Sequence, residues 1–121
     1  MKNLIPVFTC FIVASLCCAQ TNIYEDFDSY KAGEYLGTES NGVWTTWTNA
    51  TGSPEDTYVT DLLSYSGENS INLQSGGVVD VVLPLGNENS GSWTLTFRMF
   101  VEEGYGAYFN LLHYFSAAAS N

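Results

Sequence analysis

Positively charged residues are scarce in this sequence, which has three Lys and Arg against 13 Asp and Glu and a formal net charge of -10 at pH 7. Phosphate backbones and anionic lipid surfaces attract Lys and Arg, so this balance argues against nucleic acid as a partner. The acidity has two interpretations: solubility outside the cell, or binding of a divalent cation by clustered carboxylates.

An apolar run long enough to span a membrane is also missing. The run over residues 4–16 is shorter than the about 20 apolar residues that a transmembrane helix needs. Lys2 precedes it and the small Ala19 closes it, and this order of charge, apolar segment and small residue predicts a signal peptide over 1–19. We therefore expect cleavage before Gln20, a secreted or cell-surface location, and no membrane insertion after cleavage.

The mature chain, residues 20–121, lacks cysteine, because Cys10, Cys17 and Cys18 all precede it. An exported protein without disulfides must be stabilised by its core, its sheet hydrogen bonds or a bound metal. A lipoprotein signal at Cys18 is the alternative to simple cleavage, although Cys17 fits poorly where a small residue is expected. Aromatic residues make up 15% of the chain and charged residues 13%, the reverse of a disordered composition, and the length suits one small domain.

Helical periodicity is missing from the mature chain, where no segment carries apolar residues at helical spacing for more than two turns. Segments rich in β-branched and aromatic residues, separated by Gly, Asn and Ser turns, predict strands instead. They are 23–27, 43–48, 57–62, 70–74, 78–83, 92–101 and 105–115. In 78–83, alternation gives one face to Val79, Val81 and Leu83. In 92–101, it predicts a core face of Trp93, Leu95, Phe97, Met99 and Val101. The class is all-β, an antiparallel sandwich or jelly roll.

Several motifs follow one another along the mature chain. They are residues 24–30 (YEDFDSY) with Gly33, 43–47 (VWTTW), 79–86 (VDVVLPLG), 93–101 (WTLTFRMFV) and 108–113 (YFNLLH). In this order they resemble the N-terminal half of a bacterial concanavalin A-like (laminin G-like) jelly roll, of the kind found in large secreted proteins of bacteria that use type IX secretion. The resemblance implies an antiparallel β-sandwich over 20–121 that is incomplete at its C-terminus, because such domains have more strands.

Catalytic motifs are missing as well. Family 16 glycoside hydrolases, which share the jelly roll, place their carboxylates as Glu-x-Asp-x-x-Glu on one strand, and no such spacing occurs here. Glu102 and Glu103 are adjacent and point in opposite directions if extended. No Gly-x-Ser-x-Gly elbow accompanies the one histidine, His113, whose strand parity with apolar neighbours predicts a packed side chain. We expect a chain without enzymatic activity.

Aromatic side chains and amides supply the material for sugar binding, in which a ring stacks on the apolar face of a pyranose and polar groups satisfy its hydroxyls. Trp44 and Trp47 are three positions apart, so in a strand they face opposite sides, one in the core and one exposed. Tyr108, Asn110 and Tyr114 share one face of the last segment. These five residues are the candidate carbohydrate-binding set. The alternative for Tyr108, Asn110 and Tyr114 is that they form a second packed face.

Two aspartates near the start of the mature chain are candidate metal ligands. Asp26 and Asp28 lie two apart, on one face if the segment is a strand, and Glu25 adds a carboxylate beside them. Such hard oxygen ligands suit calcium, and the resemblance implies a structural ion near this position in related jelly rolls. Calcium takes about six to eight oxygens, so surface acidity stays the alternative.

The sequence thus favours a secreted, non-catalytic binding or adhesion module whose partner is a polysaccharide or glycan. Fold resemblance carries part of this expectation. Two other functions remain open: the N-terminal part of a secreted polysaccharide-degrading enzyme, and a structural spacer of a surface protein.

Overall fold

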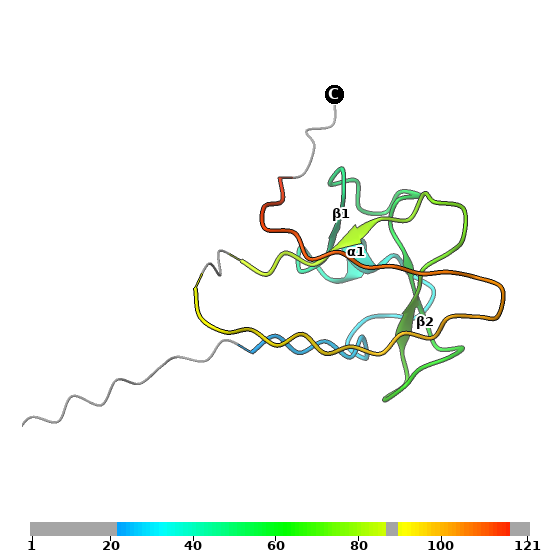
Figure 1. Ribbon diagram of the computed structural model, residues 1–121. Helices are drawn as coiled ribbons and strands as arrows, with labels where there is room; N and C mark the ends of the chain where they lie inside the picture. The colour runs from blue at the N-terminus through cyan, green and yellow to red at the C-terminus, as the bar shows by residue number, and fades with distance from the viewer. Residues whose placement is uncertain (1–21, 87–89, 117–121) are drawn as a thin grey trace, which may run out of the picture.

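The computed structural model describes residues 22–86 and 90–116, which contain one helical turn and four short strands (Figure 1). The elements are α1 (Leu36–Glu39), β1 (Thr45–Thr46), β2 (Tyr58–Thr60), β3 (Ser70–Asn72) and β4 (Val81–Val82). This part of the chain is a small all-β fold with almost no helix, as the sequence predicts. It includes no helix with the length and apolar character that crossing a membrane requires. The predicted signal peptide, 1–19, and Cys18 within it lie outside the described residues.

The four strands pair two by two in antiparallel sheets. β1 pairs with β4, with Thr46 opposite Val81, and β2 pairs with β3, with Val59 opposite Ile71 at the centre. Each strand lies inside a segment that alternation of β-branched residues predicts: 43–48, 57–62, 70–74 and 78–83. These four predictions are confirmed, although each strand is shorter than its segment.

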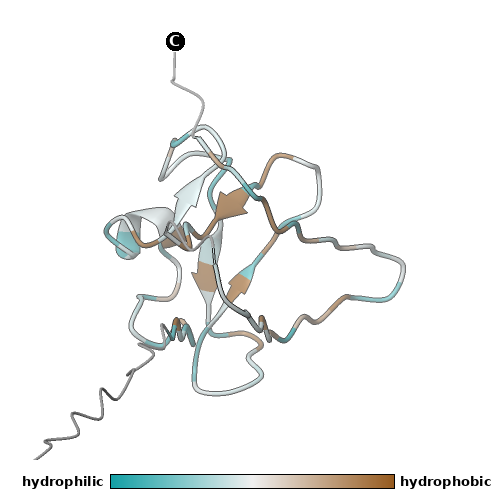
Figure 2. Ribbon diagram, turned by 60° about the vertical axis from the view of Figure 1, so that its left-hand side comes forward, coloured by the Kyte–Doolittle hydropathy of each residue, from teal (hydrophilic) through white to brown (hydrophobic). Residues whose placement is uncertain are grey.

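In the β1–β4 sheet the hydrophobic residues lie on one strand. Figure 2 shows β4 in the colour of hydrophobic residues, whereas its partner β1, a pair of threonines, is pale. Around β4 the predicted apolar face of Val79, Val81 and Leu83 is half-buried, and so is Val82 on the other side, while Val78 and Asp80 are exposed. Alternation therefore separates the two sides of this segment only in part.

The interior is small and largely polar. Leu36 and Val59 are the fully buried hydrophobic side chains of the described residues. Four buried residues are polar or charged: Ser40, Thr46, Asp56 and Thr57. Every buried side-chain nitrogen or oxygen in the described part of the chain has a hydrogen-bond partner. For example, the Thr57 hydroxyl donates to the carbonyl of Asn72 at 2.6 Å, which ties the start of β2 to the end of β3. Hydrogen bonds therefore stabilise this interior along with apolar burial, because buried polar groups are costly unless paired.

Helix α1 is a single turn where the sequence predicts only glycine turns. Ser40 ends it: its backbone N–H donates to the carbonyl of Leu36 at 2.8 Å, and its hydroxyl accepts the backbone N–H of Trp44 at 3.0 Å. Asn41 then adopts a left-handed backbone conformation with φ of 49°, which Asn tolerates better than most residues. Backbone capping at Ser40 and a chain reversal thus stop the helix after four residues.

Residues 90–116 form an extended arm that doubles back beside the paired strands (Figure 1). The predicted strands 92–101 and 105–115 are not formed, and within the described part of the arm the one backbone hydrogen bond is Tyr105 N–H to the Glu102 carbonyl, at its tip. The predicted core face is exposed, from 41% at Met99 to 53% at Trp93, so that prediction is wrong. The other members of that face, Leu95, Phe97 and Val101, are exposed too. The residues between them are exposed as well, because alternation cannot supply a neighbouring strand to bury one face.

Ring contacts join the two legs of the arm to each other and to the body. The Phe97 and Phe109 rings meet edge to face with centroids 4.6 Å apart, one from each leg. The Arg98 guanidinium lies 4.9 Å from the ring centroid of Tyr65, in the loop after β2. The arm is therefore held by side chains rather than by a β-ladder.

Candidate functional site

Trp44, the first of the predicted sugar-binding residues, is directed into the protein. Its indole N–H donates to Glu25 Oε2 at 3.1 Å, and its ring lies 5.8 Å from the ring of Phe27. The side chain is half-buried. The one donor of Trp44 is thus satisfied and its ring packs against Phe27, so the side chain helps to hold the N-terminal segment in place.

Trp47, the second, is the more exposed of the two, in line with the prediction that one is buried and the other exposed. Its side chain is 43% exposed, and its ring is tilted by 59° against the ring of Phe115 at a centroid distance of 5.4 Å. Its backbone N–H donates to the carbonyl of Asp80 at 3.0 Å, beside β4. The backbone is thus fixed beside β4, and the indole contacts Phe115 while it still offers surface to solvent.

The other three predicted residues lie on the returning leg of the arm. Tyr108 and Tyr114 are 82% and 79% exposed, and Asn110 is exposed as well. Tyr114 precedes Phe115 in the chain, so the Phe115–Trp47 contact brings it to the end of the arm where Trp47 lies. Tyr108 is six positions earlier, up to about 20 Å away along an extended chain. The structure therefore brings Trp47 into contact with Phe115, the chain neighbour of Tyr114, whereas Tyr108 lies farther along the leg.

His113 is exposed on the same leg, so the prediction of a packed histidine is wrong. Its strand parity with Phe109 and Leu111 carries no burial, because both of these apolar residues are themselves exposed. This leg does not pack on a sheet, and strand parity alone therefore does not predict which of its side chains are buried.

The predicted metal ligands Asp26 and Asp28 hold backbone rather than converging on an empty space. Asp28 Oδ1 accepts the backbone N–H groups of Glu68 and Asn69, both at 2.9 Å. Asp26 Oδ1 accepts the backbone N–H of Asp28 at 3.2 Å. A Cβ at Gly67 would collide with the Asp28 carboxylate, and the positive φ of 66° there also requires glycine.

This arrangement does not by itself fit calcium. Within residues 22–86 and 90–116 there is no group of three or more His, Cys, Asp and Glu side chains that could hold a metal ion. Two carboxylates that already accept backbone N–H groups leave too few free oxygens for the about six to eight that calcium takes. What the geometry does show is that Asp28 fastens the turn before β3 to the N-terminal segment.

Glu25 organises the N-terminal segment, which is not a strand as predicted. Its Oε1 accepts the backbone N–H of Phe27 at 2.8 Å, and its Oε2 accepts the Tyr30 hydroxyl at 2.7 Å and the Trp44 indole. Phe27 has a positive φ of 65°, which turns the chain and is incompatible with a continuous strand. Burial, together with the hydrogen bond to Glu25, raises the pKa of Tyr30 to about 12.

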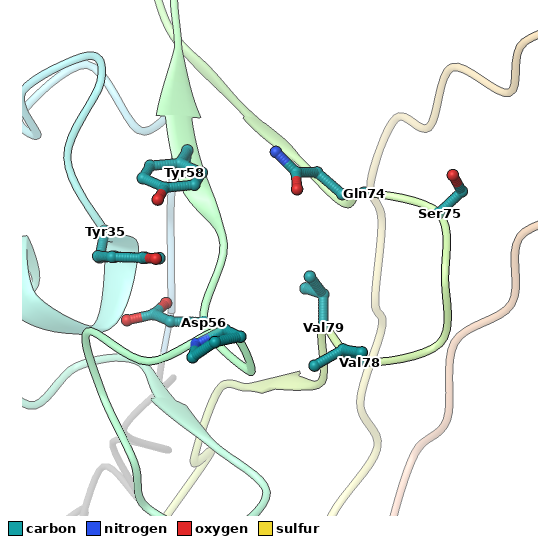
Figure 3. Close-up of a pocket in the computed structure, with 8 residues that line it drawn as sticks. Tyr35, Asp56, Tyr58, Gln74, Ser75, Val78 and Val79 are labelled. Carbon is teal, nitrogen blue, oxygen red and sulfur yellow. The ribbon is translucent and has the colours of Figure 1, made fainter.

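A pocket that the sequence does not reveal lies between β2 and the segment 74–79 (Figure 3). Its cavity volume is about 270 Å³. Tyr35 and Tyr58 form one side, with their rings stacked at a centroid distance of 4.3 Å and an interplanar angle of 25°. Gln74 and Ser75 supply an amide and a hydroxyl. The apolar part of the lining consists of Pro54, Val78 and Val79.

Asp56 also lines the pocket, but its carboxylate is turned toward α1 (Figure 3). Both of its oxygens accept the backbone N–H of Gly37 at 3.1 Å, Oδ2 accepts that of Gly52 at 2.9 Å, and Oδ1 accepts that of Thr57 at 2.8 Å. The side chain is 2% exposed. Only a weak signal, an aspartate just before a predicted strand, could have pointed to it, because its partners are backbone groups distant in sequence.

Comparisons with known proteins return no match: no family model fits the chain, and neither a curated protein nor a solved structure is significantly similar to it. The resemblance to concanavalin A-like domains therefore stays a prediction. Function has to be inferred from the exposed aromatic residues and the pocket themselves.

Proposed function

We propose that this chain is a secreted, non-catalytic binding module for a glycan, built as part of a concanavalin A-like antiparallel β-sandwich. The observation that carries the proposal is Trp47, whose indole is positioned by Phe115 and by a backbone hydrogen bond to Asp80 yet remains 43% exposed. A rigid, partly exposed indole is the kind of surface on which the apolar face of a pyranose stacks.

Tyr114 is the chain neighbour of Phe115, and we include it in the surface that we name the Trp47 surface and define as Trp47, Tyr114 and Phe115. Tyr114 is 79% exposed and adds a second aromatic ring with a hydroxyl that can donate or accept a hydrogen bond. Two aromatic groups with a polar handle can hold a polymer by stacking on its rings, which tolerates a flat, open surface. Asn110 and Tyr108 lie further along the leg, and a longer glycan would reach them.

The charge of the chain favours a neutral glycan. The formal net charge of -10 repels uronates and sulfated sugars, because like charges meet at the surface. Neutral polysaccharides carry no charge and are unaffected. A neutral glycan outside the cell is thus the partner that composition and the Trp47 surface support together.

A glycan array with the secreted protein tests this function. We expect binding to neutral glycans that falls at least tenfold in Trp47→Ala and in Tyr114→Ala. The matched control is Trp93→Ala, since Trp93 is also about half exposed, at 53%, but belongs to the other leg of the arm. No binding by protein with a cooperative unfolding transition would overturn the proposal and leave a spacer. Release of reducing sugar from a bound polysaccharide would instead point to an enzyme.

A second experiment tests calcium binding. If a structural ion binds at Asp26 and Asp28, addition of calcium raises the melting temperature of the protein and chelation by EDTA lowers it, since a ligand that binds only the native state stabilises it. Asp28→Asn separates this from the turn-fastening role. An amide oxygen still accepts the N–H groups of Glu68 and Asn69, whereas the negative charge that attracts calcium is gone.

A further inference from the structure

We infer that the pocket beside Tyr35 and Tyr58 is a second binding subsite, which takes a single neutral sugar ring. The inference rests on the proposed function, because it names a ligand of the same class, but it uses residues separate from the Trp47 surface. Its starting point is the combination of an aromatic wall, an apolar floor and two uncharged polar side chains in one cavity (Figure 3).

The size of the cavity limits its occupant to about one ring. Its volume of about 270 Å³ lies just below the roughly 300 Å³ at which pockets for drug-sized molecules begin. A hexopyranose is smaller than such a molecule, whereas a disaccharide matches or exceeds it. The pocket is therefore suited to a terminal ring or a monosaccharide, while the open Trp47 surface suits a stretch of polymer.

The chemistry of the lining matches the two sides of a pyranose. Val78, Val79 and Pro54 offer an apolar surface for ring CH groups. The Gln74 amide and the Tyr35 hydroxyl both point into the space that these residues enclose, and each can donate and accept hydrogen bonds (Figure 3). Groups that both donate and accept hydrogen bonds pair well with sugar hydroxyls, which have the same two capabilities.

The tyrosine pair is held in place before any ligand arrives. Tyr35 and Tyr58 face each other in an antiparallel β-bridge. Backbone hydrogen bonds flank the pair on both sides: Leu36 N–H to the Thr57 carbonyl at 2.8 Å, and Val59 N–H to the Glu34 carbonyl at 3.0 Å. A wall whose backbone is fixed loses little conformational entropy on binding, which favours affinity from a small contact area.

Charge excludes acidic ligands from this pocket. None of its lining residues is a cation, and the one charged residue among them is Asp56, which is buried with its carboxylate turned toward α1. The hydroxyl of Tyr58 raises the pKa of Tyr35, so this side chain stays neutral at physiological pH. A uronic acid would bring a negative charge next to Asp56 without a counter-ion, and we expect it to bind much more weakly than the neutral sugar.

Titration of the secreted protein with methyl β-D-glucopyranoside, methyl β-D-galactopyranoside and methyl α-D-mannopyranoside, followed by amide NMR shifts, tests the inference. We expect saturable shifts around Tyr58 and Gln74 with at least one of these probes, and at least tenfold weaker binding of D-glucuronate. Gln74→Ala and Tyr35→Phe, which remove the two groups that point into the cavity, should each weaken the binding at least fivefold. Tyr65→Phe is the matched control for the tyrosine, because Tyr65 is 75% exposed and contacts Arg98 instead.

The Trp47→Ala variant separates this inference from the proposed function. It should lose the binding of polysaccharides and keep that of the methyl glycosides. If wild-type protein binds polysaccharide in a Trp47-dependent manner but none of the methyl glycosides shifts the pocket amides, the pocket inference fails and the proposed function stands. If shifts occur but persist unchanged in both Gln74→Ala and Tyr35→Phe, the pocket is likewise excluded. If neither polysaccharide nor monosaccharide binds, both proposals fail together.

Discussion

The backbone N–H of Gly37 lies 3.1 Å from each carboxylate oxygen of Asp56, so that a helix of one turn is fastened to the start of β2 by a single buried side chain. The same carboxylate holds Gly52 and Thr57. One negative charge therefore fixes the chain at three places, and α1 depends on it because so short a helix has little stability of its own.

A methyl group at Gly37 is expected to break this arrangement. A Cβ there would lie 2.6 Å from Thr51 Cγ2 and 2.7 Å from Asp56 Oδ2, well inside van der Waals contact. We expect Gly37→Ala to lower the free energy of unfolding by about 1–3 kcal/mol, the usual cost of overpacking a close-packed site. Urea unfolding followed by tryptophan fluorescence measures it. Gly106→Ala is the control, since nothing lies within 4 Å of a Cβ at Gly106, and equal losses in both variants would contradict the close approach.

We expect the protein to lose stability at high pH, when the Tyr30 hydroxyl ionises. Its pKa is raised from 10.0 to about 12 by burial and by the Glu25 carboxylate, so the folded state favours the neutral hydroxyl. That contribution is fully present below pH 10 and disappears as the pH rises through 12. The difference in 295 nm absorbance between wild type and Tyr30→Phe should titrate near pH 12, and Glu25→Gln should move it toward 10. A midpoint at 10 in the folded protein would contradict the hydrogen bond.

Asp80 is expected to lower the stability in the same direction, with rising pH, but in the acidic range near its own pKa. Partial burial, with repulsion from Glu55, raises its pKa above the ordinary 3.8. A raised carboxyl pKa contributes stability when the group is protonated and loses it as the pH rises through the folded pKa, so the ionised group is unfavourable at neutral pH. We expect Asp80→Asn to raise the melting temperature at pH 7 and to leave it unchanged at pH 3. A decrease at pH 7 would show that the Asp80 charge is needed.

The amides of the arm are expected to exchange with solvent much faster than those of the paired strands. Backbone N–H groups of β2 and its neighbours are paired, as for Val59, whereas the described part of the arm has one backbone hydrogen bond, at Tyr105. We expect amides of residues 92–101 to exchange close to the rate of an unfolded peptide, and the amide of Val59 to be protected by several orders of magnitude. Exchange NMR at pH 5 distinguishes them. Protection of the arm comparable to that of Val59 would mean that its strands are paired in solution.

The sequence pattern predicts strands correctly where a segment finds a partner strand, and incorrectly where it finds none. The strands around Thr46, Val59, Ile71 and Val81 all lie in segments with β-branched alternation, and all find a partner. Residues 92–101 have the most regular alternation in the chain, yet they form no ladder in the described part of the structure. Periodicity records which side chains share a face, but pairing depends on a second segment that the pattern does not name.

In the candidate site, too, local features could be predicted from the sequence, whereas long-range contacts could not. The spacing of Trp44 and Trp47 is local, so the greater burial of one and the exposure of the other could be predicted from the sequence. The Tyr35–Tyr58 stack and the role of Asp56 depend on contacts between residues far apart in the chain, which no local pattern contains. The acidic residues Asp26 and Asp28 read as metal ligands, because carboxylates that hold backbone N–H groups look the same in sequence as carboxylates that hold an ion.

The nesting of the two strand pairs sets an order for folding. β2 and β3 are joined by a short connection and lie between β1 and β4 in the chain, so one pair is enclosed by the loop that the other closes. Loop closure costs more entropy as the loop lengthens, so the inner hairpin is expected to form first. Once Val59 and Ile71 face each other, the chain between Thr46 and Val81 is effectively shorter, and the outer pair can close around it. Changes that weaken the inner hairpin should thus slow folding, while changes in β1 or β4 should mainly speed unfolding.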